Sequence, residues 1–371
     1  MANADGTLPP TLRDQFLRDG YLVLPHFFDP APILARAKQI VEDEFSLDGH
    51  PLTKFSTGDE EGKDGSAHVG DAYFLNSGDK VRFFLEEDAV GPTGELLVPR
   101  ERSVNKVGHA LAVLDPVFHH FTFEERVQNV ARSLGLHRDP RVLQSMLICK
   151  QPSIGGPVPE HNDSTFLYTD PPTALGFWFA LEDCTPSNGC LSFQPGSHLH
   201  PPSAAPSSGS GSSSSGSGSS SSGSGGGASS PASRRPRLIP QADRERLGLG
   251  EERGVNRRFV RARVGDGSDQ AGTTFVSLGE EREGEEAVWD DRQVRVEACE
   301  AGALVLIHGS VLHKSERNRS ERSRYIYTFH MIEAEEEGAK YDERNWLQPT
   351  AKMPFSRLYA PPPAPKAPVY E

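Results

Sequence analysis

Two short apolar runs lie close together in the stretch LGFWFALEDCTPSNGCLSFQ, residues 175–194. The runs LGFWFAL and GCLSFQ are separated by Asp, Thr, Pro, Ser and Asn, which are typical of turns. Short apolar runs bounded by turn residues predict β-strands. The pattern recurs after residue 140 in SMLICK, FVRARV, GALVLIH and RYIYTFHMI. This part of the chain therefore predicts an all-β sandwich or barrel.

Helical patterns dominate the chain before residue 140. Thr11 is placed to cap a first helix that stops at Gly20, ahead of the strand-like run YLVL. A second helix is expected to open at Asp29 and Pro30 and to run toward Phe45.

A further helix is predicted in TFEERVQNVARSLG, residues 122–135. Thr122 and Glu125 have the spacing of a capping box, and Gly135 is a stop signal. Apolar residues fall on one face of the segment, as a helix packed on a core requires.

The length of 371 residues, 36% of them hydrophobic, is enough for a sizeable core. We expect one domain over residues 1–371, with a helical part at about 8–140 and a β core at about 141–335. The Ser/Gly-rich stretch 203–235 cannot bury enough apolar surface to offset its ordering entropy, so it is predicted to be a disordered insert. It lies between two expected strands, which favours a loop insertion over a linker between domains.

The charge balance excludes some classes of protein. With 39 basic and 52 acidic residues the net charge is −13, which argues against a nucleic-acid partner. No run of about 18 apolar residues is present, so no membrane span is expected. The start MANADGTLPP does not resemble a secretory signal, and the end PVYE is not a peroxisomal address. The four cysteines form no CxxC motif, which favours a reduced, cytoplasmic protein without a cysteine zinc site.

The stretch PEHNDSTFLYTD, residues 159–170, places His161 and Asp163 two positions apart. In an extended chain such residues point to the same face, so imidazole and carboxylate can meet at one metal ion. The motif alone is weak evidence, because His137-Arg138-Asp139 has the same spacing. That second copy precedes Pro140 and is expected to be a turn.

A third ligand must come from far along the chain. The stretch GALVLIHGSVLHKSERNRSERSRYIYTFH, residues 302–330, offers His308, His313 and His330. Two histidines and one carboxylate are the facial triad of non-haem iron oxygenases, and they leave positions open on the metal. Arg324 follows His313 by eleven residues, and its planar guanidinium suits a carboxylate. His308 and His198 remain rival ligands, with a core position as the simpler role for each.

These motifs together resemble the phytanoyl-CoA dioxygenase family of Fe(II)- and 2-oxoglutarate-dependent oxygenases. The segments YFLNSGDKVRFFLEE, NKVGHAL, EDCTPSNGCLSFQPGSH, LVLIHGSVLHKS and NWLQPT also resemble segments of that family. The resemblance implies a mainly β fold with flanking helices, a double-stranded β-helix of the jelly-roll or cupin type. The Ser/Gly insert and Asn162, where relatives often have Gln, are departures from the family pattern.

Carried over to this sequence, the resemblance implies that His161, Asp163 and His313 are the iron ligands and the catalytic centre. It implies that Arg324 binds 2-oxoglutarate, in a pocket lined by Lys106, Met146 and Trp178. Trp178 can equally be a core aromatic residue, and Lys106 an ordinary surface lysine.

The expected activity is hydroxylation of a small organic substrate with release of succinate and CO2. Fe(II), 2-oxoglutarate and O2 are the expected cofactor and cosubstrates, with ascorbate as a candidate stimulant. An acyl-CoA or another lipid-like metabolite is among the expected substrates, and the sequence carries no signal for an oligomeric state. The alternatives are a catalytically weak 2-oxoglutarate sensor of the same fold and a zinc hydrolase, in which Arg324 would have no purpose.

Overall fold

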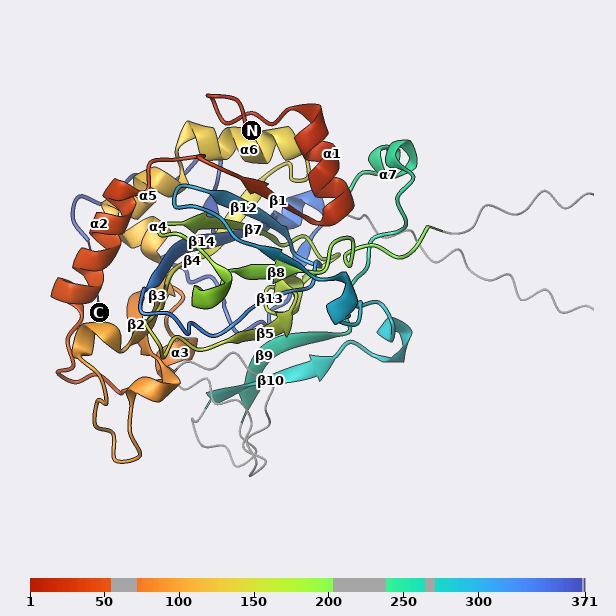
Figure 1. The fold of residues 1–371 in the computed structure, drawn as a ribbon. Helices are drawn as coiled ribbons and strands as arrows, with labels where there is room; N and C mark the ends of the chain where they lie inside the picture. Colours follow the sequence, from red (N-terminus) through yellow and green to blue (C-terminus); the bar gives the residue numbers. More distant parts are fainter. Residues whose placement is uncertain (55–71, 203–237, 264–270, 369, 371) are drawn as a thin grey trace, which may run out of the picture.

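The computed structural model describes residues 1–54, 72–202, 238–263, 271–368 and 370, which form two main antiparallel sheets, two short two-stranded ladders and flanking helices (Figure 1). The predicted insert at 203–235 lies outside the described residues.

The larger sheet has eight strands, and most of the predicted strands belong to it. Their order is β1 (Tyr21–Leu24), β12 (Leu304–His308), β7 (Leu175–Ala180), β14 (Arg324–Glu333), β4 (Pro140–Lys150), β3 (Val104–His109) and β2 (Val81–Leu85), with β16 (Ser356–Arg357) paired to β4.

The smaller sheet has the order β11 (Arg295–Glu297), β8 (Leu191–Phe193), β13 (His313–Ser315) and β5 (Val158–His161). Two further ladders pair β15 (Lys340–Tyr341) with β6 (Thr169–Asp170), and β10 (Ala271–Ser277) with β9 (Arg257–Arg263). Strands β7 and β8, the two runs of residues 175–194, fall in different sheets.

The two main sheets face each other across a buried apolar cluster. Trp178 and Ile326 of the larger sheet share this cluster with Leu191 and Phe193 of the smaller one. A chain that alternates between two facing antiparallel sheets in this way is a double-stranded β-helix, as the family resemblance implied.

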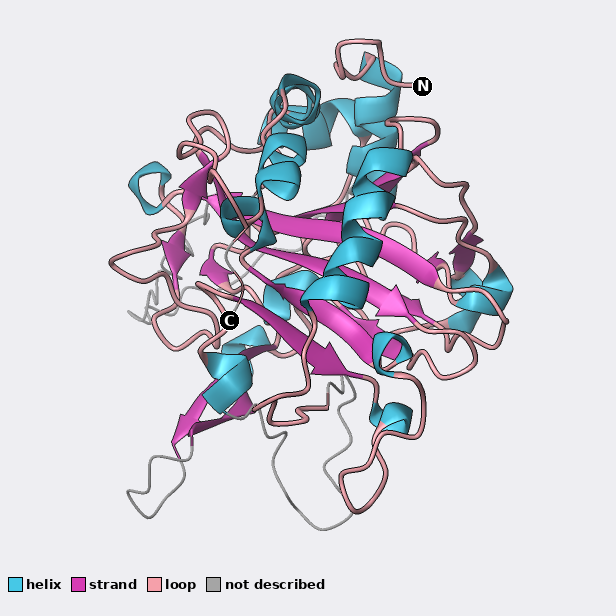
Figure 2. Cartoon of the chain, turned by 90° about the vertical axis from the view of Figure 1, so that its left-hand side faces the viewer, coloured by secondary structure: helices cyan, strands magenta, loops and turns pink. Residues whose placement is uncertain are grey.

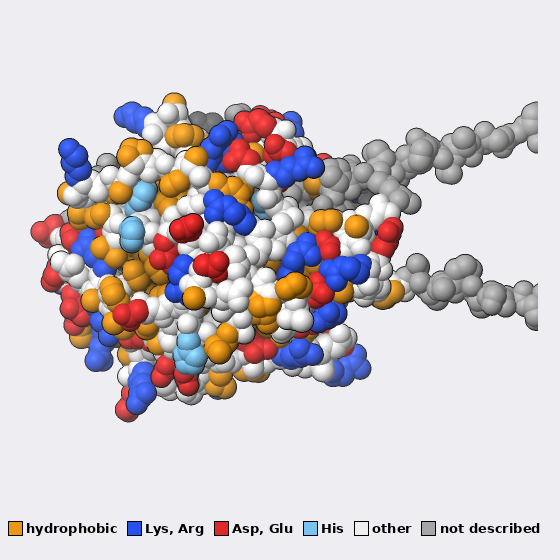
Figure 3. Space-filling view, turned by 90° about the horizontal axis from the view of Figure 1, so that it is seen from above, with side chains coloured by type: hydrophobic (Ala, Val, Ile, Leu, Met, Phe, Trp, Pro, Cys, Tyr) orange, Lys and Arg blue, Asp and Glu red, His pale blue; other side chains and the backbone are white. Residues whose placement is uncertain are grey.

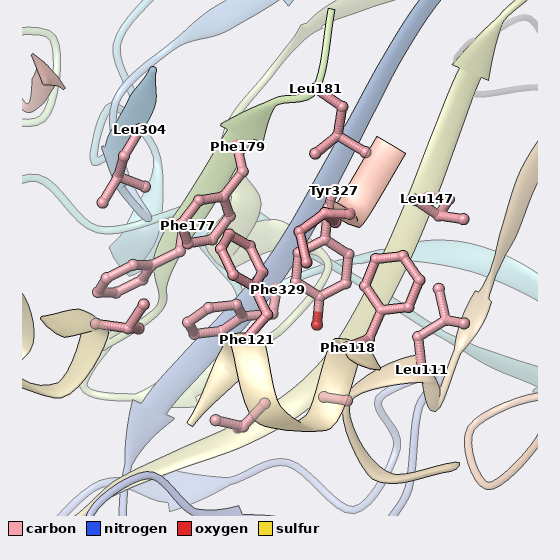
Figure 4. Packing of buried hydrophobic residues seen from close by; sticks show 14 of the residues in the cluster. Leu111, Phe118, Phe121, Leu147, Phe177, Phe179, Leu181, Leu304, Tyr327 and Phe329 are labelled. Carbon is pink, nitrogen blue, oxygen red and sulfur yellow. The ribbon is translucent and has the colours of Figure 1, made fainter. Parts of the chain in front are cut away.

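The other face of the larger sheet carries the main core. Along β14, Tyr327 and Phe329 point to this side, where Phe329 stacks on Phe177 with ring centroids 4.8 Å apart. Phe118 and Phe121 of α5 (Pro116–Thr122) pack onto these rings (Figure 4). Figure 2 shows helices lying in front of the strands of this sheet. The helices thus cover the apolar face and leave the opposite face to line the barrel interior.

The remaining helices are α1 (Pro10–Asp19), α2 (Ala31–Gln39), α3 (Ala72–Leu75), α4 (Leu111–Leu114), α6 (Glu125–Leu134) and α7 (Gln241–Leu247). A π-helical turn η1 (Ile40–Glu44) continues α2, and the 3-10 turns are η2 (Glu87–Ala89), η3 (Arg100–Arg102), η4 (Asp163–Thr165), η5 (Pro186–Asn188), η6 (Glu280–Arg282), η7 (Asp291–Gln293) and η8 (Glu335–Glu337).

The stops predicted at Gly20 and Gly135 are right, and the second helix opens after Asp29 and Pro30 and continues to Phe45 as predicted, but the caps predicted at Thr11 and Thr122 are wrong. Gly20 and Gly135 adopt φ angles of +79° and +64° and end α1 and α6, as the stop signals indicated. Thr11 caps no helix, because α1 already begins at Pro10, a residue suited to a first helical position. Thr122 belongs to α5, and its hydroxyl bonds to the Phe118 carbonyl and to the Tyr327 hydroxyl instead of forming a capping box.

The part of the chain predicted as helical, residues 8–140, also contributes β1, β2 and β3 to the larger sheet. No helix within the described ranges is long and apolar enough to cross a bilayer. Seen from above Figure 1, acidic and basic side chains are interspersed over the surface (Figure 3). This face therefore carries both signs of charge.

Candidate metal centre

His161 and His313 lie directly opposite each other on paired strands of the smaller sheet. His161 ends β5, His313 opens β13, and their ring centroids are 4.2 Å apart. Asp163 begins η4, and its Oδ1 lies 3.6 Å from His161 Nε2 and 3.8 Å from His313 Nε2. One potential ligand atom of each residue lies within 4.8 Å of the others. The fold thus brings together three residues that the sequence holds far apart.

Backbone carbonyls orient both imidazole rings. Nδ1 of His161 lies 2.8 Å from the Pro159 carbonyl, and Nδ1 of His313 lies 3.2 Å from the Val311 carbonyl. A carbonyl only accepts hydrogen bonds, so the proton sits on Nδ1 and the Nε2 lone pair faces Asp163. This is the tautomer that a metal-binding histidine needs.

The protonation of the trio also suits a cation. Burial, followed by the neighbouring His161, lowers the pKa of His313 to about 4, so this imidazole is neutral near pH 7. Burial alone would raise the pKa of Asp163, but His330 and His313 hold it well below its usual value. Asp163 is buried, and among the described residues its Oδ2 has no well-aligned hydrogen-bond partner. A buried carboxylate next to oriented nitrogen donors fits a divalent metal ion.

Asn162, between the two ligands of the HxD motif, points away from them. Its Oδ1 accepts a hydrogen bond from the Thr165 amide at 3.0 Å, and its Nδ2 donates to Glu286 Oε1 at 2.7 Å. This confirms the expected alternation. Asn162 caps the turn that sets the position of Asp163.

The barrel-facing wall of the larger sheet runs from this centre to Arg324. Strand register aligns the inward residues of β7, β14, β4 and β3 in successive rows: Gly176, His330 and Gln144; then Trp178, Thr328, Met146 and Gly108; then Ala180, Ile326, Ile148 and Lys106; and last Arg324 with Lys150. Gly176, in the first row, lies beside Asp163. The four residues predicted to contact a cosubstrate therefore all face the barrel interior.

The guanidinium of Arg324 lies in the last row of this wall. The residue is 2% exposed, its Nη1 donates to the Gly189 carbonyl at 2.9 Å, and its Cζ lies 5.5 Å from the centre of the Trp178 ring. Its Nε has no hydrogen-bond partner among the described residues. Burial also lowers the pKa of Lys106 to about 7. An anion in the barrel would relieve the cost of burying this guanidinium.

Comparison with known proteins decides the family. The sequence model for phytanoyl-CoA dioxygenase (PhyH) matches residues 16–213 and 250–326. The chain belongs to the phytanoyl-CoA dioxygenase family. Phytanoyl-CoA dioxygenase domain-containing protein 1 of Bos taurus is 39% identical over 355 residues, covering 95% of this chain and 99% of the relative. Its homolog of Caenorhabditis elegans is 38% identical over 351 residues, covering 94% and 98%.

The solved structures support the fold of this family member. The non-heme alpha ketoglutarate dependent carbocyclase SnoK from nogalamycin biosynthesis matches with a TM-score of 0.50 and 14% identity, covering 95% of this chain and 98% of that one. At this identity the likeness concerns the fold alone. The family and the double-stranded β-helix predicted from the sequence are thus confirmed.

The rival histidines of this family member are engaged elsewhere. His308 Nε2 lies 3.0 Å from Glu252 Oε1, and His198 Nε2 lies 3.1 Å from the Leu17 carbonyl. His137, of the second HxD copy, contacts the Thr173 carbonyl at 2.7 Å. Their nitrogens therefore serve core contacts and do not join the trio.

His330 is the residue whose place the sequence left open. Its Nε2 lies 3.2 Å from Asp163 Oδ2, although the contact is not aligned as a good hydrogen bond. Strand alternation in RYIYTFH puts His330 on the same face as Arg324, which is a signal the sequence does contain. The structure places it beside the carboxylate, on the oxygen other than the one nearest to His161 and His313.

Proposed function

We propose that this member of the phytanoyl-CoA dioxygenase family is an Fe(II)- and 2-oxoglutarate-dependent dioxygenase that hydroxylates a small organic substrate. The observation that carries the proposal is the meeting of His161, Asp163 and His313 at one end of a barrel wall that ends in the buried Arg324. A metal site and an anion site that face the same barrel interior are what a metal-chelating dicarboxylate requires.

His161 Nε2, His313 Nε2 and an Asp163 oxygen would hold the ferrous ion. When bound, the iron supplies O2 activation coupled to decarboxylation of the 2-oxo acid to succinate and CO2. The carbonyls of Pro159 and Val311 keep the proton on Nδ1 of each histidine, so both donor nitrogens stay available.

Arg324 would bind the distal carboxylate of 2-oxoglutarate through the donors that it does not spend on Gly189. Trp178 and Met146, two rows nearer to the metal end than Arg324, would flank the carbon chain of the cosubstrate and exclude water. Lys106, on the neighbouring strand, would add a donor to the same pocket. These residues orient the cosubstrate so that its 2-oxo acid end faces the histidines.

The test is equilibrium dialysis of 2-oxoglutarate against the purified protein without oxygen, with and without Fe(II). We expect binding that depends on Fe(II) in the wild type and falls sharply in His161→Ala. Binding of equal strength without metal, or no binding with iron bound, would contradict the proposal. The substrate class, including an acyl-CoA, is tested by offering candidates and measuring the gain of one oxygen atom by mass spectrometry.

A further inference from the structure

Two cationic side chains face each other at the end of the barrel wall. Arg324 of β14 and Lys150 of β4 are directly opposite in register, and both are buried, with 2% and 1% exposure. Side chains directly opposite on antiparallel strands are neighbours, and like charges in such a pair destabilise the sheet. Burial makes the repulsion more costly. A fully charged pair here therefore needs compensation.

The groups around Lys150 supply little negative charge to compensate this pair. Those that act on its charge are Arg324 from β14, Glu86 after β2, Glu316 after β13 and Cys190 before β8, with Lys106 of β3 one row away. Glu86 is buried, but its Oε2 already accepts hydrogen bonds from Asn105 Nδ2 at 2.8 Å and the Gly156 amide at 3.0 Å. Burial also raises the pKa of Glu86. One buried carboxylate that is already engaged, together with the exposed Glu316, thus stands against three buried basic side chains.

The hydrogen bonds of Lys150 fit a neutral amine. Its Nζ donates to the Ser315 carbonyl at 3.2 Å and to the Glu316 carbonyl at closer range. A neutral amine has two N–H bonds, which these carbonyls accept, and one lone pair; an ammonium has a third donor to satisfy. Burial, followed by the charge of Arg324, lowers the pKa of Lys150 to about 6.

Both basic groups converge on Gly189. Its carbonyl accepts the hydrogen bond of Arg324 Nη1, and a Cβ added at Gly189 would lie 3.1 Å from Lys150 Nζ. Gly189 also has a φ angle of +81°. Both this backbone conformation and the short distance to Lys150 disfavour a side chain at this position. An anion held by Arg324 near this point would lie close to Lys150 as well.

We propose that Lys150 takes up one proton from solvent when the distal carboxylate of 2-oxoglutarate binds Arg324, so that the dianion and a proton bind together. The inference rests on the proposed function of the site. Before binding, the amine is neutral, and its hydrogen bonds to the Ser315 and Glu316 carbonyls connect β4 to the residues that follow His313. The carboxylate then supplies the negative charge that stabilises an ammonium beside the guanidinium. Lys150 is a positioning residue for the cosubstrate.

The direct test is calorimetry of 2-oxoglutarate binding to the iron-loaded protein without oxygen, at about pH 8, in two buffers with different heats of ionisation. The difference in binding heat gives the number of protons taken up. We expect uptake approaching one proton in the wild type, and a clear loss of it in Lys150→Met. Lys352→Met, at an exposed position, should match the wild type.

A measurement on the wild type alone guards against a Lys150→Met variant that does not fold. The dissociation constant of 2-oxoglutarate should rise by up to about tenfold per pH unit between about pH 7 and 9, because proton uptake is linked to binding. Binding without proton uptake, a constant affinity over this range, or unchanged uptake in Lys150→Met would each overturn the inference and leave the proposed function standing. No binding of 2-oxoglutarate to the iron-loaded protein would overturn both.

Discussion

The Nε2 atom of His330 lies 3.2 Å from Oδ2 of Asp163, on the oxygen that does not face the two triad histidines. Oδ1 of the same carboxylate faces His161 and His313. The carboxylate is therefore held from behind, with one oxygen directed to the candidate metal position. Residues that hold a metal ligand in this way affect metal affinity without touching the metal.

Gly176 leaves the room that this contact needs. A Cβ at Gly176 would lie 3.3 Å from His330 Nε2 and 3.4 Å from Asp163 Oδ2. We expect Gly176→Ala to fold and to bind Fe(II) about tenfold more weakly, because the new methyl group crowds His330, the residue that contacts the Asp163 carboxylate. Competition with a chelator measures the affinity. Gly272→Ala on β10, where a Cβ meets nothing within 4 Å, is the control, and equal affinities in the two variants would contradict this account.

Replacing His313 by alanine should have a different effect from replacing His308. His313→Ala removes a ligand nitrogen, so we expect loss of Fe(II) binding in a folded protein. His308→Ala should keep Fe(II) binding and lose about 1–3 kcal/mol of stability, because it removes the partner of Oε1 of the buried Glu252 and leaves only the Ile239 amide on Oε2. Dialysis of Fe(II) and urea unfolding measure both effects. Iron retained in His313→Ala but lost in His308→Ala would reverse the assignment.

Arg324 should matter to the cosubstrate and not to the metal. Arg324→Ala removes the buried guanidinium, and truncating one partner of a buried charged pair costs roughly 2–5 kcal/mol, so 2-oxoglutarate should bind weaker by one to several powers of ten. Arg324→Lys keeps a charge and loses the planar fork, so its loss should be smaller. Arg322, two residues earlier and exposed, is the control. A variant Arg322→Ala that lost 2-oxoglutarate binding while Arg324→Ala kept it would refute the role given to Arg324.

Lys150 should also shape the pH dependence of stability. Its pKa is about 6 in the folded protein, and an unfolded lysine titrates near about 10.4. Between these values the unfolded chain binds more protons, so the free energy of unfolding rises with pH. We expect Lys150→Met to gain less stability than the wild type between about pH 6.5 and 9 in urea unfolding without cosubstrate. Parallel curves for the two proteins would show that Lys150 keeps its charge in the fold.

The strands were predictable from the sequence because their periodicity is local. Runs such as RYIYTFHMI and LGFWFAL have one face in the apolar core and the other in the barrel, and both became strands of the larger sheet. Helix starts were less predictable, because tertiary contacts compete with local capping. The Thr122 hydroxyl bonds to Tyr327, a residue 205 positions away, and no local pattern contains that information.

Some features of the candidate site also follow from local sequence, whereas others depend on distant strand pairing. The alternation of His161 and Asp163 is local, whereas the pairing of His161 with His313 depends on the register of β5 and β13. The resemblance to a family supplied the distant partner in advance. Lys150 carried no signal in SMLICK, because only the pairing of β4 with β14 places it opposite Arg324.

The central claim is that the His161, Asp163 and His313 site turns over 2-oxoglutarate, and succinate formation tests it most directly. Purified protein would be supplied with Fe(II), ascorbate, 2-oxoglutarate and O2, and succinate would be measured against a matched Asp163→Ala variant. We predict succinate from the wild type, slowly even without the primary substrate, and none above background from Asp163→Ala. A flat succinate trace from wild-type protein that demonstrably holds iron and 2-oxoglutarate would contradict the claim.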